Sequence, residues 1–185
     1  MSVFHPTQAG IGGALWKLRR QSRGFTLIEL MVTIAVIALI AAVASPAMIT
    51  LMNSNRLSST AGELTSAAQL ARAEAIRRSA PVVLCASDDG ATCTAGADWQ
   101  GWAVVGQNNR DAVEETIRGG LFPGNMQLSG PADGITFNST GLIAAGTTLT
   151  ACIPTDKPAD NQRVITISVA GHVMTARNNG GGDCP

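Results

Sequence analysis

The sequence predicts an α+β protein, in which one long N-terminal helix packs on a C-terminal antiparallel β-sheet or β-sandwich head. An apolar run and then an amphipathic repeat extend from about residue 25 to residue 78, which is the pattern of a single long helix. From residue 81 onward, short runs rich in β-branched residues alternate with Gly, Pro, Asn and Asp, as in strands joined by tight turns. The 185-residue length supports one domain with an appendage.

Residues 25–45 form an apolar stretch of 21 residues, which follows the basic residues Lys17, Arg19, Arg20 and Arg23. About 20 apolar residues suffice to span a hydrocarbon core of roughly 30 Å, and basic flanks stay on the cytoplasmic side. A secretory signal peptide and a plain membrane anchor share both features. The stretch therefore predicts a transmembrane first half for the helix.

Glu29 is the lone carboxylate inside this apolar stretch. An ionised carboxylate in lipid costs several kcal/mol and marks a functional site by default. A cationic partner would offset that cost. Because no small-residue cleavage site directly follows a short apolar core, an ordinary signal peptide does not explain the segment.

Pro46 removes one helical hydrogen bond, so we expect it to kink the helix rather than end it. We therefore divide the helix into a transmembrane segment, 25–46, and an amphipathic continuation, 47–80, ahead of a globular head at 81–185. The continuation carries apolar residues near helical period, which predicts one face buried against a sheet. The residues of this stripe are Leu57, Ala61, Leu64, Ala67, Ala68, Leu70, Ala71 and Ala75.

The head contains a series of short strand patterns. Trp99 and Trp102 lie in one of them, three residues apart, so we expect them on opposite faces, with one in the core and one at a subunit contact. The last two patterns are joined by a turn at Ala170 and Gly171. We expect strands at 82–85, 99–105, from 116, at 147–153, 163–169 and 171–176, and a hairpin made of 134–138 and 141–143.

All four cysteines, Cys85, Cys93, Cys152 and Cys184, lie beyond the apolar stretch. An even count in an exported domain favours disulfides. Of the three possible pairings we expect a short Cys85–Cys93 loop and a long Cys152–Cys184 loop. Neither a CxxC motif nor a Cys/His cluster with metal spacing is present, so we expect no metal site.

Charge and motifs argue against two function classes. From Phe25 onward the chain has nine basic and 13 acidic residues, a net charge of −4, whereas a nucleic-acid-binding module usually has a basic surface. The sequence shows no nucleophile elbow, P-loop, paired carboxylates or His/Asp constellation. We therefore expect no catalytic residues, no cofactor and no enzymatic activity.

The segment Gly24–Glu29, Gly-Phe-Thr-Leu-Ile-Glu, resembles the prepilin peptidase motif of type IV pilins and type II secretion pseudopilins. The resemblance implies a lollipop-shaped pilin fold, a leader peptide at 1–24, cleavage after Gly24 by prepilin peptidase and N-methylation of Phe25. It also implies that Glu29 pairs with the N-terminal amine of a neighbouring pilin or pseudopilin during filament assembly. The expected location is the bacterial inner membrane, in a single pass with the head in the periplasm, and then a pilus or pseudopilus.

Residues 70–78, 83–85, 88–93 and 99–104 resemble the GspH/FimT group of minor pilins and minor pseudopilins. Within that group, the two expected cysteine pairs look more like the FimT/FimU side. The resemblance implies a minor pilin that helps to initiate or cap a type IV pilus. The alternative is a type II secretion system pseudopilin of the GspH type.

FimT-like members are associated with DNA binding in natural transformation through a Gly-Arg-x-Arg motif in the final hairpin. The aligned residues here are Gly171, His172, Val173 and Met174, so both arginines, which clamp phosphates bidentately, are missing. Among the remaining residues, Arg163, His172 and Arg177 are the candidate weak DNA contacts. A pilus-tip DNA-binding subunit is therefore the second alternative, and DNA is the less favoured partner.

Overall fold

The computed structural model describes residues 24–108, 113–122 and 124–185. The chain divides into two compact units, Met1–Ala41 and Ala42–Pro185. The described part of the first unit consists of residues 24–26 and the start of helix α1, and the second unit contains the strands. The expected leader at 1–24 lies outside the described residues except for Gly24.

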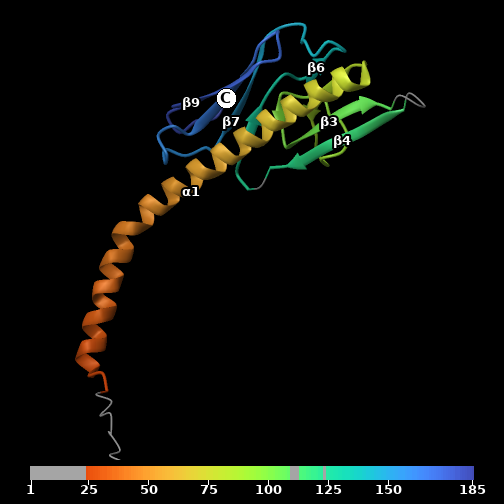
Figure 1. Cartoon of the computed structure of the whole chain (residues 1–185). Helices are drawn as coiled ribbons and strands as arrows, with labels where there is room; N and C mark the ends of the chain where they lie inside the picture. The colour runs from red at the N-terminus through yellow and green to blue at the C-terminus, as the bar shows by residue number, and fades with distance from the viewer. Residues whose placement is uncertain (1–23, 109–112, 123) are drawn as a thin grey trace, which may run out of the picture. The chain divides into compact units, whose positions relative to one another are not determined.

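Helix α1, Leu27–Arg78, is 52 residues long (Figure 1). Its N-terminus is capped by Thr26, whose Oγ1 accepts a hydrogen bond of 3.2 Å from the backbone N–H of Glu29, as is usual for an N-cap threonine. At its C-terminus Ser79 adopts φ 52°, and the N–H of Ala80 donates to the carbonyl of Ala75 at 3.2 Å. This left-handed cap satisfies helix-end carbonyls.

Pro46 lies inside α1 without ending it. The carbonyl of Pro46 accepts a hydrogen bond of 3.0 Å from Thr50 Oγ1. The helix therefore continues through Pro46 as expected, while the kink at this residue stays a prediction.

The amphipathic face of α1 is confirmed in the second unit. Its buried members are mostly alanines, which let the helix backbone approach the strands closely because they carry only a methyl group. Leu70, which the periodicity placed in the stripe, is only half-buried. The buried residues of α1 are Leu57, Thr60, Ala61, Leu64, Ala67, Ala68, Ala71 and Ala75.

The described strands form two antiparallel sheets, which confirms the expected α+β class (Figure 1). The four-stranded sheet has the order β4-β3-β1-β6, with β4 at Glu114–Leu121, β3 at Gly101–Gln107, β1 at Val82–Ala86 and β6 at Ile135–Phe137. The five-stranded sheet has the order β2-β5-β7-β8-β9, with β2 at Asp98–Trp99, β5 at Gln127–Ser129, β7 at Thr147–Cys152, β8 at Gln162–Ile167 and β9 at Val173–Asn178.

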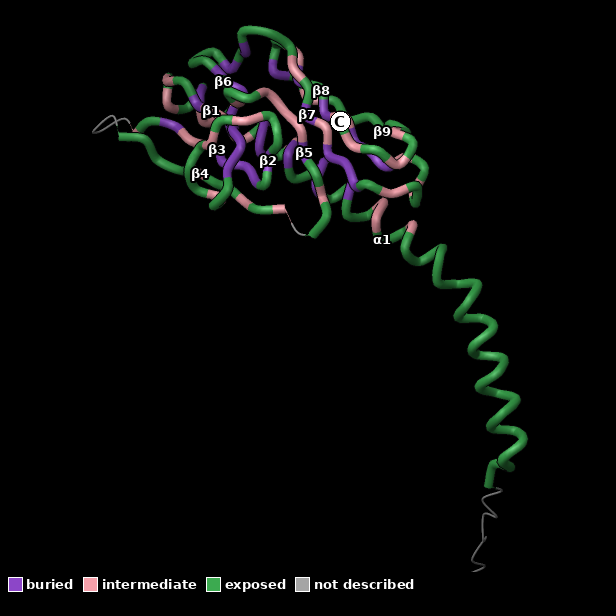
Figure 2. Tube along the Cα trace, turned by 180° about the vertical axis from the view of Figure 1, so that it is seen from behind, coloured by how far each residue is buried: buried purple, intermediate pink, exposed green. Residues whose placement is uncertain are grey.

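Both sheets and the alanine face of α1 contribute to one hydrophobic core. The strands supply its large side chains, among them Trp102, Leu84 and Phe137 from one sheet and Leu149 and Ile165 from the other. Figure 2 shows that buried residues are concentrated along the strands, whereas the first turns of α1 are exposed throughout. The core therefore belongs to the second unit.

The expectation for the two tryptophans is wrong. Trp99 and Trp102 are each only 1% exposed, because the chain passes from one sheet to the other between them. Trp99 ends β2 and pairs with Leu128 in the five-stranded sheet, whereas Trp102 belongs to β3 of the four-stranded sheet. Each ring therefore packs inward from its own sheet, and neither is free for a subunit contact.

The hairpin expected at 134–138 and 141–143 is also wrong in its second half. Only β6 forms, and the Asn138 side chain replaces further strand pairing. Its Oδ1 accepts hydrogen bonds from the backbone N–H groups of Thr140 at 2.9 Å and Leu142 at 3.1 Å. Such side-chain bonds compete with sheet ladders. The final hairpin, in contrast, is confirmed, since β8 and β9 pair around a turn in which Gly171 has φ 73°.

Both expected disulfides, Cys85–Cys93 and Cys152–Cys184, are present. The first joins β1 to the loop that follows it. The second joins β7 to the C-terminal tail across 32 positions of sequence. The two bonds therefore restrain the loop after β1 and the C-terminal tail.

Candidate functional site

The Gly24–Phe25 peptide bond lies just ahead of α1, which begins at Leu27. Nothing lies within 4 Å of the position that a Gly24 Cβ would occupy, and Phe25 is 77% exposed. The bond is thus in exposed, non-helical backbone. This geometry suits cleavage, because a peptidase must reach both sides of the bond.

Glu29 lies in the first turn of α1 and is exposed. A carboxylate at this end of a helix interacts favourably with the helix dipole. Within residues 24–108, 113–122 and 124–185, the structure records no ion pair for its side chain. The carboxylate is therefore available to a cation from outside the described residues.

Large apolar side chains surround Glu29 and continue along α1. The helix is long and apolar enough to cross a membrane, by length and composition. Exposed apolar surface on this scale marks an interface with lipid or protein. The side chains, each at least 49% exposed, are Leu27, Ile28, Leu30, Met31, Val32, Ile34, Val36, Ile37, Leu39, Ile40, Val43, Met48, Ile49, Leu51 and Met52.

Arg163 does not fit the role of an exposed DNA contact, which corrects the expectation for it. It lies on β8 and is only 3% exposed. Its Nη1 donates to the carbonyls of Asp160 and Gln162, each at 2.9 Å, and its Nη2 donates to Ser54 Oγ of α1 at 3.3 Å. Burial first, and then the nearby charge of Arg177, lower the pKa of this guanidinium.

His172 and Arg177 are both exposed, but they lie apart. His172 sits at the hairpin turn, before β9, and Arg177 is near the far end of that strand. Five residues of strand separate their positions by roughly 17 Å at about 3.3 Å per residue. The hairpin thus places Arg177 beside its register partner Arg163. His172 lies away from both arginines, so the three candidate DNA contacts do not form one cluster.

Asp89 organises the loop closed by Cys85–Cys93. Its Oδ1 accepts hydrogen bonds from the N–H of Thr92 at 2.7 Å, the N–H of Ala91 at 2.8 Å and the hydroxyl of Ser87 at 2.9 Å. The backbone bonds from Thr92 and Ala91, followed by the hydroxyl bonds, hold the pKa of this carboxyl well below its usual range. Asp89 therefore stabilises a turn.

Two polar contacts of α1 were missed from the sequence. Glu74 pairs with Arg77 at 2.6 Å and with Arg78 at 2.9 Å, and Glu63 Oε1 accepts a hydrogen bond of 3.2 Å from Trp102 Nε1. The Glu74 contacts follow the i, i+3 and i, i+4 spacing of a helix and could have been found from it. The Glu63 contact had no sequence signal, because it joins residues 39 positions apart.

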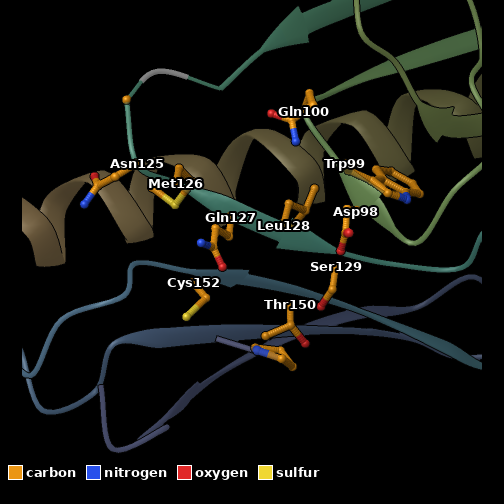
Figure 3. Close-up of a pocket in the computed structure, with 12 residues that line it drawn as sticks. Asp98, Trp99, Gln100, Asn125, Met126, Gln127, Leu128, Ser129, Thr150 and Cys152 are labelled. Atoms are coloured by element: carbon orange, nitrogen blue, oxygen red, sulfur yellow. The ribbon is translucent and has the colours of Figure 1, made fainter. Parts of the chain in front are cut away.

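A hollow of about 430 Å³ lies beside β2, β5 and β7 (Figure 3). Its lining side chains include the amides of Gln100, Asn125 and Gln127 and a single carboxylate, Asp98. The lining residues include no histidine, lysine or arginine to act as a base or to bind an anion. Cys152, another lining residue, is already bound to Cys184, so the hollow contains no free thiol among its lining residues.

An exposed apolar N-terminal helix that continues into an antiparallel β head defines a pilin-like subunit. The family described as Type II transport protein GspH matches residues 60–171, and the Prokaryotic N-terminal methylation motif matches residues 19–45. The chain belongs to the GspH family. The motif match covers Gly24, Phe25 and Glu29, so the recognised segment and the head agree on one class of protein.

One crystal form of a minor pilin, with a TM-score above 0.5, supports the same fold. Two crystal forms of the type IV minor pilin FimU of Pseudomonas aeruginosa PAO1 are each 23% identical to this chain. The match to the P21 form has a TM-score of 0.52 and covers 68% of this chain and 92% of FimU. The match to the P65 form has a TM-score of 0.48 and covers 65% of this chain and 92% of FimU. The minor pseudopilin EpsH of the Vibrio cholerae type 2 secretion system is 14% identical, with a TM-score of 0.49 over 66% of this chain and 97% of EpsH. No curated protein matches the sequence.

Proposed function

We propose that this protein is a minor pilin, a structural subunit that helps to initiate or cap a type IV pilus. The observation that carries the proposal is the position of Glu29, a lone carboxylate in the first turn of an exposed apolar helix, in a chain of the GspH family. The similarity of the fold to that of FimU, a type IV minor pilin, supports the pilus assignment.

In this proposal, residues 1–24 are a leader that prepilin peptidase removes, and the new amine on Phe25 is methylated. Residues 25–46 cross the inner membrane, residues 47–80 continue the helix, and residues 81–185 form a periplasmic head. The two disulfides fit an oxidising compartment such as the periplasm.

Glu29 then pairs with the N-terminal amine of an adjacent pilin. Inside an apolar bundle of helices, an unpaired carboxylate is strongly destabilising, whereas a paired one is tolerated. A subunit that docks out of register leaves both charges unpaired. The pair therefore selects one axial offset between neighbouring helices, and the subunit acts by assembly rather than by catalysis.

A pseudopilin of a type II secretion system is the alternative, and the description of the matched family favours it. Both assignments use the same helix and the same carboxylate. They differ in the filament that the subunit enters. DNA binding at the hairpin is not proposed, because Arg163 is buried and the hairpin lacks both motif arginines.

The test compares Glu29→Ala with the wild-type chain in the native bacterium, using immunoblots of membrane and sheared-pilus fractions. We expect Glu29→Ala to be cleaved normally and to remain in the membrane while the wild type enters the pilus fraction. Thr33→Ala is the matched control, because Thr33 lies one turn further and its hydroxyl is bound to the carbonyl of Leu30 within the helix. If deletion of the gene left piliation normal but impaired secretion, the pseudopilin alternative would be favoured. If Glu29→Ala entered the pilus fraction as the wild type does, the assembly role of Glu29 would be contradicted.

A further inference from the structure

Two arginines face each other in the last hairpin. Arg163 of β8 and Arg177 of β9 are register partners. The structure records no carboxylate within ion-pair distance of either one among the residues it describes. Like charges placed opposite each other in a sheet destabilise it, so an anion between these two side chains would remove a cost that the fold otherwise carries.

The pair opens onto a groove of about 340 Å³ between α1 and β9. Most of its lining residues are serine, threonine, alanine or glycine. Thr65 Oγ1 and Thr175 Oγ1 form a hydrogen bond of 3.4 Å that joins α1 to β9. The groove is therefore shallow and is lined by small side chains beside the two arginines. Its lining residues are Ser58, Ala61, Gly62 and Thr65 of α1, Arg163 of β8, and Thr175, Ala176 and Arg177 of β9.

The guanidinium of Arg163 retains donor capacity toward this groove. Its recorded hydrogen bonds run from Nη1 and Nη2 to two carbonyls and one hydroxyl, all of them neutral. The Nε–H has no recorded partner, yet Nε is not among the fully buried polar atoms that lack one. Nε is therefore not completely buried, although Arg163 as a whole is only 3% exposed. Burial and then the charge of Arg177 lower the pKa of Arg163, while the charge of Asp160 acts in the opposite direction.

We infer that this groove receives the carboxylate of an Asp or Glu side chain from a neighbouring pilin-class subunit of the same filament. The inference rests on the proposed function. An inserted carboxylate would accept charge-assisted hydrogen bonds from both guanidinium groups and neutralise their repulsion. The small side chains of α1 would let the neighbour's backbone approach closely enough for its side chain to reach Arg163.

A protein carboxylate fits this site better than a nucleic-acid phosphate. Arg163 is 3% exposed, so a single side chain can reach it and a duplex backbone cannot. Nucleic-acid binding also requires several phosphate contacts, whereas residues 42–185 contain nine basic and 12 acidic residues, a net charge of −3. This net negative charge repels a polyanion such as DNA more strongly than it repels a single carboxylate.

Photo-crosslinking in the native bacterium tests the site on the full-length chain. Benzoylphenylalanine is introduced at Gly62, which borders the groove and has open space at its Cβ position. Mass spectrometry identifies the crosslinked peptide. We expect a peptide of another pilin-class subunit that contains an Asp or Glu, and a crosslink yield at least tenfold lower in Arg177→Glu.

Arg118→Glu is the matched control, because Arg118 is also an exposed arginine on an edge strand, β4, but belongs to the other sheet. It should leave the crosslink yield unchanged. A yield insensitive to Arg177→Glu, an acid-free partner peptide or a crosslink to DNA would each overturn the site while leaving the proposed function intact. Absence of the wild-type chain from filaments of either system would overturn the proposed function and the site together.

Discussion

Glu63 and Trp102 are joined by a hydrogen bond of 3.2 Å between Oε1 and Nε1, which links α1 to β3. Trp102 is 1% exposed, so the carboxylate satisfies a donor that would otherwise be buried without a partner. This contact joins the helix to the four-stranded sheet through polar side chains beside the buried apolar face of α1.

Removal of the Glu63 acceptor should destabilise the head. We expect Glu63→Leu to lower the free energy of unfolding by about 1–3 kcal/mol, the cost of an unsatisfied buried donor. Glu63→Gln retains an acceptor oxygen and should lose much less. Urea unfolding of the full chain in detergent, followed by tryptophan fluorescence, measures both. Equal losses in the two variants would show that charge matters here rather than the hydrogen bond.

Substitution of Gly24 should block processing and leave the fold intact. A Cβ at Gly24 meets nothing within 4 Å, so Gly24→Val introduces no clash in the described structure. We expect an uncut precursor, heavier by the mass of residues 1–24, in intact-mass spectra of the membrane fraction. Gly62→Ala, also at an open glycine position, should be processed normally. A Gly24→Val chain of mature mass would refute cleavage at this bond.

The Glu74 ion pairs should make stability depend on acid pH. Hydrogen bonds from Arg77 and then Arg78 lower the pKa of Glu74 from 4.5 to about 2. Their stabilisation is therefore complete above about pH 4.5 and is lost as the pH falls toward 2. Glu74→Gln should cost about 1 kcal/mol or less at pH 7, as is usual for such pairs, and nothing near pH 2.

Thermal unfolding of the wild type and Glu74→Gln between pH 2 and pH 7 provides the measurement. Asp133→Asn is the control, because Asp133 is exposed and the structure records no ion pair for it. The stability difference between Asp133→Asn and the wild type should not show the pH dependence expected for Glu74→Gln. A Glu74→Gln difference that persists undiminished at pH 2 would contradict the assignment.

The longer disulfide should stabilise the protein more than the shorter one. Loop-closure entropy predicts a loss of about 4 kcal/mol for Cys184→Ser and about 2.5 kcal/mol for Cys93→Ser, since the bonds span 32 and 8 positions. Urea unfolding of each variant beside the oxidised wild type measures the losses. The reverse order would mean that local packing around Cys93 outweighs chain entropy.

Features encoded in neighbouring residues could be predicted from the sequence. The apolar stretch, the position of Glu29, the alanine stripe and the final hairpin each depend on local spacing. The two disulfide pairs also emerged, because only three pairings were available and one of them closes a short loop.

Features that depend on distant contacts could not be predicted in this way. Strand periodicity alone cannot reveal that the chain changes sheets at Gln100, because the partners of Trp99 and Trp102 are set by β5 and β4. Likewise, Arg163 is an exposed strand arginine on sequence grounds. Its burial requires α1, whose Ser54 meets it from 109 positions away.

The alanine face of α1 has a mechanical consequence. Its buried residues run from Leu57 to Ala75, a length of roughly 27 Å at about 1.5 Å per residue, and they lie lengthwise against the head. Tension along this part of the helix is directed parallel to the interface. Such a load acts in shear on all of these contacts at once and does not break them one after another, so the head resists force along α1 better than force across it.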